Sequence, residues 1–153
     1  MKIYIALITL IFSFPIFASN DLTGKNIVCS KINKNKDLYI VGYEFSPNNE
    51  VSIFTYDNVN QGFKNLSQIN WTYRTTLSKI KVYEVFDDNS LSNFYYEIDR
   101  ATLEVTWGNL TSKKTNFKGN SDECSVYANE LIYNNLNKNL FKLKKELTKN
   151  NKI

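Results

Sequence analysis

The segment QINWTYRTT, residues 68–76, has the clearest secondary-structure pattern of the chain. Its apolar and polar side chains alternate strictly, so that Ile69, Trp71 and Tyr73 lie on one face of an extended backbone. A period of two with one polar face is typical of a β-strand that is buried on one side and exposed to solvent on the other.

Similar runs of β-branched and aromatic residues extend outward from this segment, from Lys25 to Lys118, with turn residues between them. The pattern predicts a mainly β fold, an antiparallel meander of about seven or eight strands that forms a strongly bent sheet or a barrel. The run at 37–45 is apolar on much of both faces, so we expect both to be covered. The expected strands are 25–30, 37–45, 50–56, 68–76, 78–86, 93–99, 102–107 and a weaker one at 112–118.

After Gly119 the apolar residues recur every three or four positions, which predicts a C-terminal α-helix over about 122–148, packed on the sheet. The apolar stripe consists of Ile132, Leu136, Leu140, Leu143 and Leu147. The other side is basic and carries Lys138, Lys142, Lys144, Lys145 and Lys149. We expect the stripe to face the sheet. The alternative is that these lysines contact an anionic membrane surface or a partner.

The amino-terminal residues 1–18 have the three parts of a cleavable export signal: Lys2, an apolar run to Phe17, and the small residue Ala18. Cleavage after Ala18, or one residue later, would leave a single domain of residues 19–153 in the periplasm or outside the cell. The alternative is an uncleaved membrane anchor, but the run is interrupted by Pro15 and is shorter than the roughly 18 to 20 residues that a span needs.

Cys29 and Cys124 are the two cysteines of the chain. An even number of cysteines in an exported protein predicts a disulfide bond, here between the first expected strand and the start of the C-terminal segment. The alternative is a reactive thiolate at Cys124, close to residues 120–122, which could cap a helix.

The chain has a formal net charge of +4 and no histidine. The lack of histidine excludes Ser-His-Asp and Cys-His mechanisms and His-ligated zinc. Of the 19 basic residues, Arg74 and Arg100 are the only arginines, although arginine is the residue that most often recognises bases through paired hydrogen bonds. The few glycines form no phosphate-binding loop. We therefore expect no nucleic-acid partner, no metal and no cofactor.

Three aromatic residues on expected strands, Trp71, Tyr73 and Trp107, are candidates for stacking on a ring or a sugar. The alternative is that they fill the core, since period-two spacing already accounts for them. Carboxylates that could pair across neighbouring strands, as a glycosidase requires, are Glu84, Asp87, Asp88, Glu97, Asp99 and Glu104. Each of these also occupies a position where a solvent-facing strand or turn residue is expected.

Residues 22–25 (LTGK) lead into the first expected strand, and a meander and a helix follow. This layout resembles that of the calycins, the lipocalin-type barrels, which place a tryptophan shortly after the glycine where this chain has Asn26 and Ile27. Residues 98–103 (IDRATL), followed by a strand and a cysteine, are similar to a pattern in small uncharacterised exported β-rich proteins of bacteria. The first resemblance implies a barrel, and the second implies no function.

Taken together, these features favour an exported domain that acts by binding rather than by catalysis. The expected partner is a small apolar or aromatic ligand held within the sheet, or another protein of the cell envelope. Two other classes stay open: a hydrolase that uses carboxylates alone, and a peripheral envelope component whose basic helix touches anionic lipid.

Overall fold

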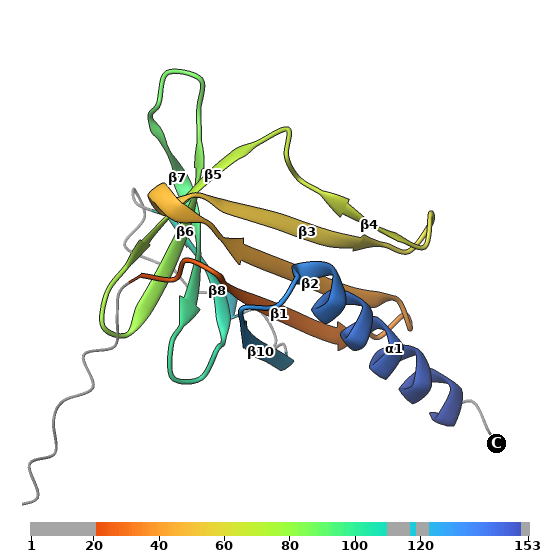
Figure 1. Ribbon diagram of the computed structural model, residues 1–153. Helices are drawn as coiled ribbons and strands as arrows, with labels where there is room; N and C mark the ends of the chain where they lie inside the picture. Colours follow the sequence, from red (N-terminus) through yellow and green to blue (C-terminus); the bar gives the residue numbers. More distant parts are fainter. Residues whose placement is uncertain (1–20, 110–116, 119–122, 151–153) are drawn as a thin grey trace, which may run out of the picture.

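The computed structural model describes residues 21–109, 117–118 and 123–150. These residues form ten strands and one α-helix, and the strands belong to two five-stranded antiparallel sheets (Figure 1). The first sheet has the order β10-β1-β2-β3-β4, with bounds Glu123–Ala128, Lys25–Ile32, Leu38–Phe45, Val51–Asp57 and Gly62–Asn65. The second has the order β5-β6-β7-β8-β9, with bounds Asn70–Thr75, Lys79–Val85, Leu91–Asp99, Val105–Asn109 and Phe117–Lys118.

The mainly β, antiparallel fold with a C-terminal helix is confirmed, and of the two expected forms the strongly bent arrangement is the one found. The strands do not close into the barrel that the calycin layout implies, because the chain leaves the first sheet after β4 and starts a second one. Among the described residues, one isolated β-bridge, between Glu50 and Thr72, links the two sheets through their backbones. Strands of the second sheet run steeply across those of the first (Figure 1).

Two strands differ from the sequence-based expectation. The short strand β4 lies between two expected strands where no strand was expected, and β10 lies where the expected helix begins. The helix α1, Ile132–Asn150, therefore starts at Ile132 rather than near 122, because residues 123–128 pair with β1. The proposed export signal, residues 1–18, lies outside the described residues.

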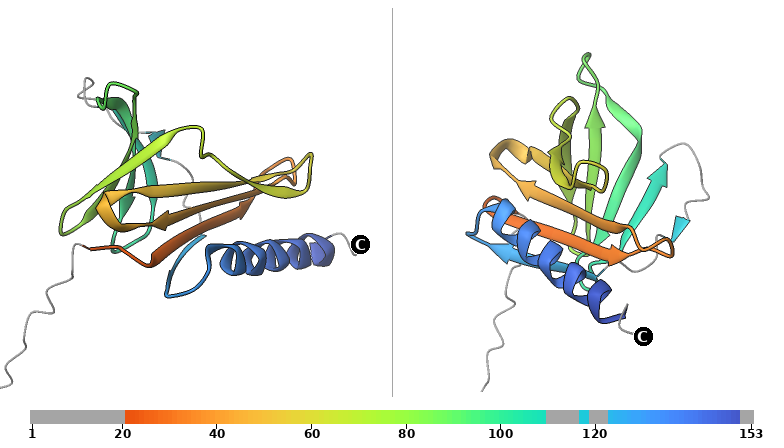
Figure 2. Two further views of the ribbon diagram at one scale, coloured as in Figure 1. Left: turned by 45° about the horizontal axis from the view of Figure 1, so that its top comes forward. Right: turned by 90° about the vertical axis from the view of Figure 1, so that its right-hand side faces the viewer.

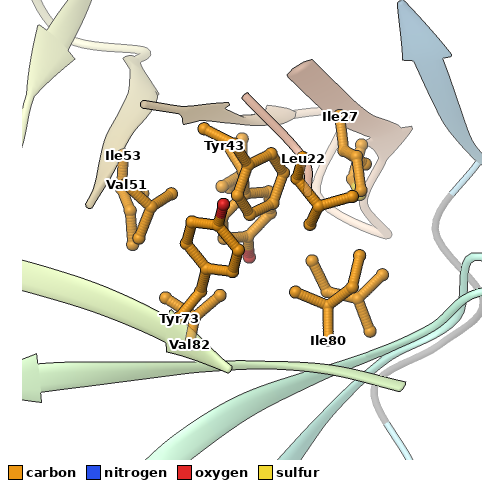
Figure 3. Packing of buried hydrophobic residues seen from close by; sticks show 12 residues of the cluster. Leu22, Ile27, Tyr43, Val51, Ile53, Tyr73, Ile80 and Val82 are labelled. Carbon is orange, nitrogen blue, oxygen red and sulfur yellow. The ribbon is translucent and has the colours of Figure 1, made fainter. Parts of the chain in front are cut away.

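The main core fills the space between the two sheets (Figure 3). The first sheet contributes alternate side chains of β1, β2 and β3, and the second contributes alternate side chains of β5, β6 and β7, as the period-two pattern requires. Phe45 and Tyr73 meet edge to face across the interface, with ring centroids 5.0 Å apart. The buried residues shown in Figure 3 include Leu22, Ile27, Tyr43, Val51, Ile53, Tyr73, Ile80 and Val82.

The helix α1 lies on the face of the first sheet that is turned away from the second sheet (Figure 2). Its apolar stripe packs there as expected, and Gly42 allows the close approach, since a Cβ at that position would lie 2.9 Å from Leu136 Cδ2. The same interface holds buried amides: Asn135 Nδ2 donates to Asn26 Oδ1 at 3.0 Å, and Ser30 Oγ donates to Asn139 Oδ1 at 3.1 Å. These hydrogen bonds fix the position of the helix along β1.

Cys29 and Cys124 form the expected disulfide bond. The two residues stand directly opposite each other on the neighbouring strands β1 and β10, and the bond closes a sequence separation of 95 residues. Because Cys29 is buried in the core between the sheets, the disulfide holds the edge strand β10 beside that core.

Candidate aromatic pocket

A pocket of about 350 Å³ lies on the inner face of the second sheet. It is found near the β6–β7 hairpin, which extends past the first sheet in Figure 1, so that this part of the inner face is not covered by strands of the other sheet. The described lining residues, which we call the aromatic pocket, are Trp71, Glu84, Ser92, Phe94, Tyr95 and Tyr96.

A break in the pairing of β6 and β7 shapes the pocket. Tyr83 pairs with Tyr95, but the next pair is Val85 with Leu91, so that Glu84 alone faces residues 92–94. An irregularity of this kind separates two strands locally and re-aims side chains, which is why such bulges are common beside binding sites. Phe94 is left 55% exposed at this point.

The aromatic rings and the carboxylate of the pocket are close neighbours. Trp71 stands opposite Glu84 in the pairing of β5 and β6, and the rings of Trp71 and Tyr96 have centroids 5.9 Å apart. Burial raises the pKa of the Tyr96 hydroxyl, and the negative charge of Glu84 raises it further. Within the described residues no ion pair involves Glu84.

Two buried polar groups at the pocket differ in their hydrogen bonding. The buried hydroxyl of Ser92 accepts a hydrogen bond from the backbone N–H of Phe94 at 3.1 Å. The indole Nε1 of Trp71 is buried and has no hydrogen-bond partner in the described structure. A buried donor without an acceptor is rare and lowers stability.

A second hollow, of about 490 Å³, adjoins the aromatic pocket at Trp71. It lies between the start of β3 and the start of β5, and its lining is rich in hydroxyl and amide side chains, among them Ser52, Asn65 and Thr72. The two hollows are thus continuous at Trp71: the first is lined mainly by aromatic side chains, and the second mainly by side chains that can form hydrogen bonds.

The outer face of the second sheet carries a different arrangement of charge. Lys81 Nζ lies 4.7 Å from the centroid of the Tyr95 ring and 3.6 Å from Glu97 Oε2. Lys79 bridges Glu97 and Asp99, with Nζ–O distances of 3.3 and 2.9 Å. Hydrogen bonds from the Thr102 backbone N–H and from Lys79 hold the pKa of Asp99 well below its usual value. Two of the carboxylates considered for a hydrolase are therefore ion-paired on this outer face, and a lowered pKa does not suit a general acid.

The three aromatic residues singled out from the sequence have different positions. Trp71 lines the pocket. Tyr73, two residues along the same strand, is 3% exposed and packs in the core against Phe45. Trp107 lies on β8 opposite Tyr96 in the strand pairing, and its side chain is outside what the structure describes.

Sequence reasoning did not assign a binding role to Phe94, Tyr96 or Glu84. The sequence of β6 could have pointed to Glu84. Its inward-facing residues are Ile80, Val82 and Glu84, so that a carboxylate follows two buried aliphatic residues on the same face. The bulge that brings Glu84 opposite residues 92–94 depends on pairing between strands, and no local pattern marks it.

The candidate lysines of α1 lie on its outward side. Lys138, Lys144, Lys145 and Lys149 are exposed, as is Lys142, and Lys138 Nζ lies 5.7 Å from the Tyr127 ring centroid. Phe141, in the midst of these lysines along the helix, is 72% exposed. The helix thus has a basic outer side with one prominent ring.

Over the part of the chain that the structure describes, no group of three or more metal-ligating side chains comes together, and no helix is long and apolar enough to cross a membrane. Comparison of the sequence and the fold with protein-family models, with curated proteins and with solved structures gave no significant match.

Proposed function

We propose that this protein is an exported, non-catalytic binding domain and that the aromatic pocket is its ligand site. The observation that carries the proposal is the pocket itself: a hollow of about 350 Å³ whose lining combines four aromatic residues with one carboxylate. Ligand sites in proteins are mostly concave and apolar, with a few polar groups that orient the ligand. The lining side chains come from neighbouring strands of one sheet, which hold them in fixed relative positions.

Export is supported by two features. The disulfide between Cys29 and Cys124 suits an oxidising compartment, and residues 1–18 have the composition of a cleavable signal. Mass spectrometry of the protein from the periplasm or medium should give a chain that begins at Ser19 or Asn20 and has no free thiol. A chain that keeps Met1 there, or one with two free thiols, would contradict the assignment.

The size of the pocket favours a small ligand or a single side chain of a partner. Ligand pockets commonly range from about 300 to 1,000 Å³, and this one is near the lower limit. The adjoining polar hollow, with Ser52 and Thr72, would contact any part of the ligand that extends beyond the rings. This is the ligand-binding class of function rather than the hydrolase class.

A ligand-observed NMR screen tests the proposal with neutral, cationic and anionic fragments of small size. Saturation transfer from the wild-type protein to at least one class of fragment should disappear in Phe94→Ala, because that change removes an exposed wall of the pocket. Phe141→Ala is the matched control, since it also removes an exposed phenylalanine but lies on α1. If no fragment separates the wild type from Phe94→Ala, the aromatic pocket is not the site.

A second candidate function follows from Phe141 and the surrounding lysines, which together would suit an anionic membrane surface. The apolar stripe of α1 is already used in packing against the first sheet, so this contact would involve one ring and several charges rather than insertion of the helix. Co-sedimentation with phosphatidylglycerol vesicles should exceed that with phosphatidylcholine vesicles and fall in Phe141→Ala but not in Phe94→Ala. Equal sedimentation of the three proteins would remove this candidate.

A further inference from the structure

We propose that the aromatic pocket selects an organic cation, namely an alkylammonium group carried by a small molecule or by a lysine side chain of a partner protein. The inference rests on the proposed function, because it takes the pocket as the ligand site and names the chemistry of the ligand. Three features of the described residues carry it: the set of rings, the single charged group among them, and a matching arrangement on the other face of the same sheet.

The rings come first. Trp71 and Tyr96 are side by side with centroids 5.9 Å apart, and Phe94 adds a third ring that is half exposed. The face of an aromatic ring carries partial negative charge and attracts cations, most strongly for tryptophan. Several rings around one hollow surround an alkylammonium group with such faces while they also contact its apolar methyl or methylene groups.

The charge of the pocket lining has the complementary sign. Glu84 is the one charged residue among the described lining residues, and it is half buried. Its carboxylate is close enough to Tyr96 to oppose ionisation of that hydroxyl. In a hollow from which water is partly excluded, a carboxylate attracts a cation more strongly than it does in bulk water and repels an anion. The pocket is thus locally acidic in a chain whose net charge is +4.

The outer face of the same sheet shows how the same groups combine when the cation belongs to the protein. There Lys81 Nζ lies 4.7 Å from the Tyr95 ring centroid and 3.6 Å from the Glu97 carboxylate. On the inner face, Tyr96 and Glu84 supply the ring and the carboxylate from the same two strands, β7 and β6. In the aromatic pocket the ammonium group would come from the ligand.

Isothermal titration calorimetry with choline chloride is the direct test. The control ligand is the neutral carbon isostere of choline, in which a tert-butyl group replaces the trimethylammonium group, and sodium chloride holds the ionic strength constant. We expect choline to bind roughly tenfold more tightly than the isostere, as a partly desolvated cation–π contact implies.

Two charge-neutralising variants locate the effect. Glu84→Gln should weaken choline binding by about tenfold and leave binding of the isostere unchanged. Glu97→Gln is the matched control, because it removes a half-buried carboxylate from the outer face of the same sheet and should leave choline binding unchanged. Far-ultraviolet circular dichroism and a urea midpoint for each variant verify that the fold is kept.

A lysine derivative separates the two sources of the ammonium group. Lysine that is acetylated on its α-amine and carries a C-terminal methylamide keeps the side-chain ammonium group of a protein lysine. The same compound with an acetylated side chain is the neutral control. Tighter binding of the free amine than of choline supports a partner protein, and the opposite order supports a small molecule. In either case the free amine should bind more tightly than its side-chain-acetylated form, as selection of a cation requires.

The outcomes that overturn the inference are distinct from those that overturn the proposed function. If the neutral isostere binds as tightly as choline and Glu84→Gln changes neither, the pocket binds apolar ligands and the cation inference is wrong. If neither compound binds, and the fragment screen also shows no effect of Phe94→Ala, then both the inference and the proposed function fail.

Discussion

The space between the two sheets has a closed end and an open end, and both are built from the same three strands. At the closed end Tyr73, Val82 and Ile98 are almost completely buried against the first sheet. At the open end the inward positions of the same strands are Trp71, Glu84 and Phe94, which line a pocket. On each strand, inward side chains only two to four positions apart therefore lie in different environments, one in the core and the other in the pocket wall.

The difference shows that alternation along a strand tells which side chains point inward but not what they meet there. Ile98 and Phe94 are both inward residues of β7, yet one is 0% exposed and the other 55%. Steep crossing of two sheets leaves part of each inner face uncovered, and the bulge between β6 and β7 widens that part. Changes at the closed end should therefore affect stability, and changes at the open end should affect binding.

Loss of the disulfide should have the largest effect, because Cys29 belongs to the closed end. Cys29→Ser with Cys124→Ser removes a link across 95 residues, for which the chain-entropy model gives a loss of about 4 kcal/mol in the free energy of unfolding. Urea unfolding measures it. Reduction of the wild type should cause a comparable loss, and reductant should not change the double variant. A loss below about 1 kcal/mol would show that the core holds β10 without the bond.

A pair of truncations on β7 tests the comparison most directly. Ile98→Ala should lower the free energy of unfolding by about 3 kcal/mol, because it leaves a cavity in a filled core. Phe94→Ala, on the same face of the same strand, should cost less than about 1 kcal/mol although it removes more atoms. Urea midpoints of both variants provide the measurement. Equal losses would mean that the open end is packed as tightly as the closed end.

Glu84→Leu should have a smaller effect of opposite sign. The change continues the apolar series of Ile80 and Val82 on the inner face of β6 and removes a half-buried carboxylate, so we expect a gain of about 0.5 to 1 kcal/mol. A residue kept at some cost in stability is typical of a binding site. A destabilised Glu84→Leu protein would instead assign Glu84 a structural role. The urea midpoint decides between the two.

Much of the fold could be predicted from residues alone. The strict alternation at 68–76 identified β5, and the run at 37–45 was correctly expected to be covered on both faces, by the second sheet and by α1. The disulfide followed from two cysteines and from the expectation that the protein is exported. These features depend on local periodicity or on a count, which are properties that a single sequence displays.

Features that depend on pairing between distant segments were missed. Residues 123–128 were expected to begin the helix, yet they pair with β1, a partner nearly a hundred residues away. Asn135 and Asn139 read as modest helix formers, whereas both are buried and hydrogen-bonded to residues of β1. The sheet crossing and the bulge that form the pocket belong to this class. From the sequence, Trp71 was identified as a ligand contact and Glu84 only as a possible catalytic carboxylate, whereas Phe94 was not identified as a site residue.

The smallest expected effect concerns acid stability at the turn that ends the closed side of β7. Asp99 Oδ1 accepts hydrogen bonds from the backbone N–H groups of Ala101 and Thr102, both at 2.9 Å, and its pKa is lowered from 3.8. A carboxyl whose pKa is lower in the folded state stabilises the fold above pH 3.8, and this contribution is lost as the pH falls toward the folded-state value. Asp99→Asn should therefore reduce the slope of stability against pH below 3.8.

Urea midpoints of the wild type and Asp99→Asn from neutral pH down to about pH 2 provide the test. The two curves should lie apart at neutral pH and converge as the wild-type carboxyl is protonated. Because Asp99 follows Ile98 directly, its turn anchors the closed end, and choline binding at the open end should be the same in both proteins. Curves that stay parallel down to about pH 2 would show that Asp99 does not contribute to acid sensitivity. A change in choline binding would show that the two ends are energetically coupled, which the separate packing of Ile98 and Phe94 argues against.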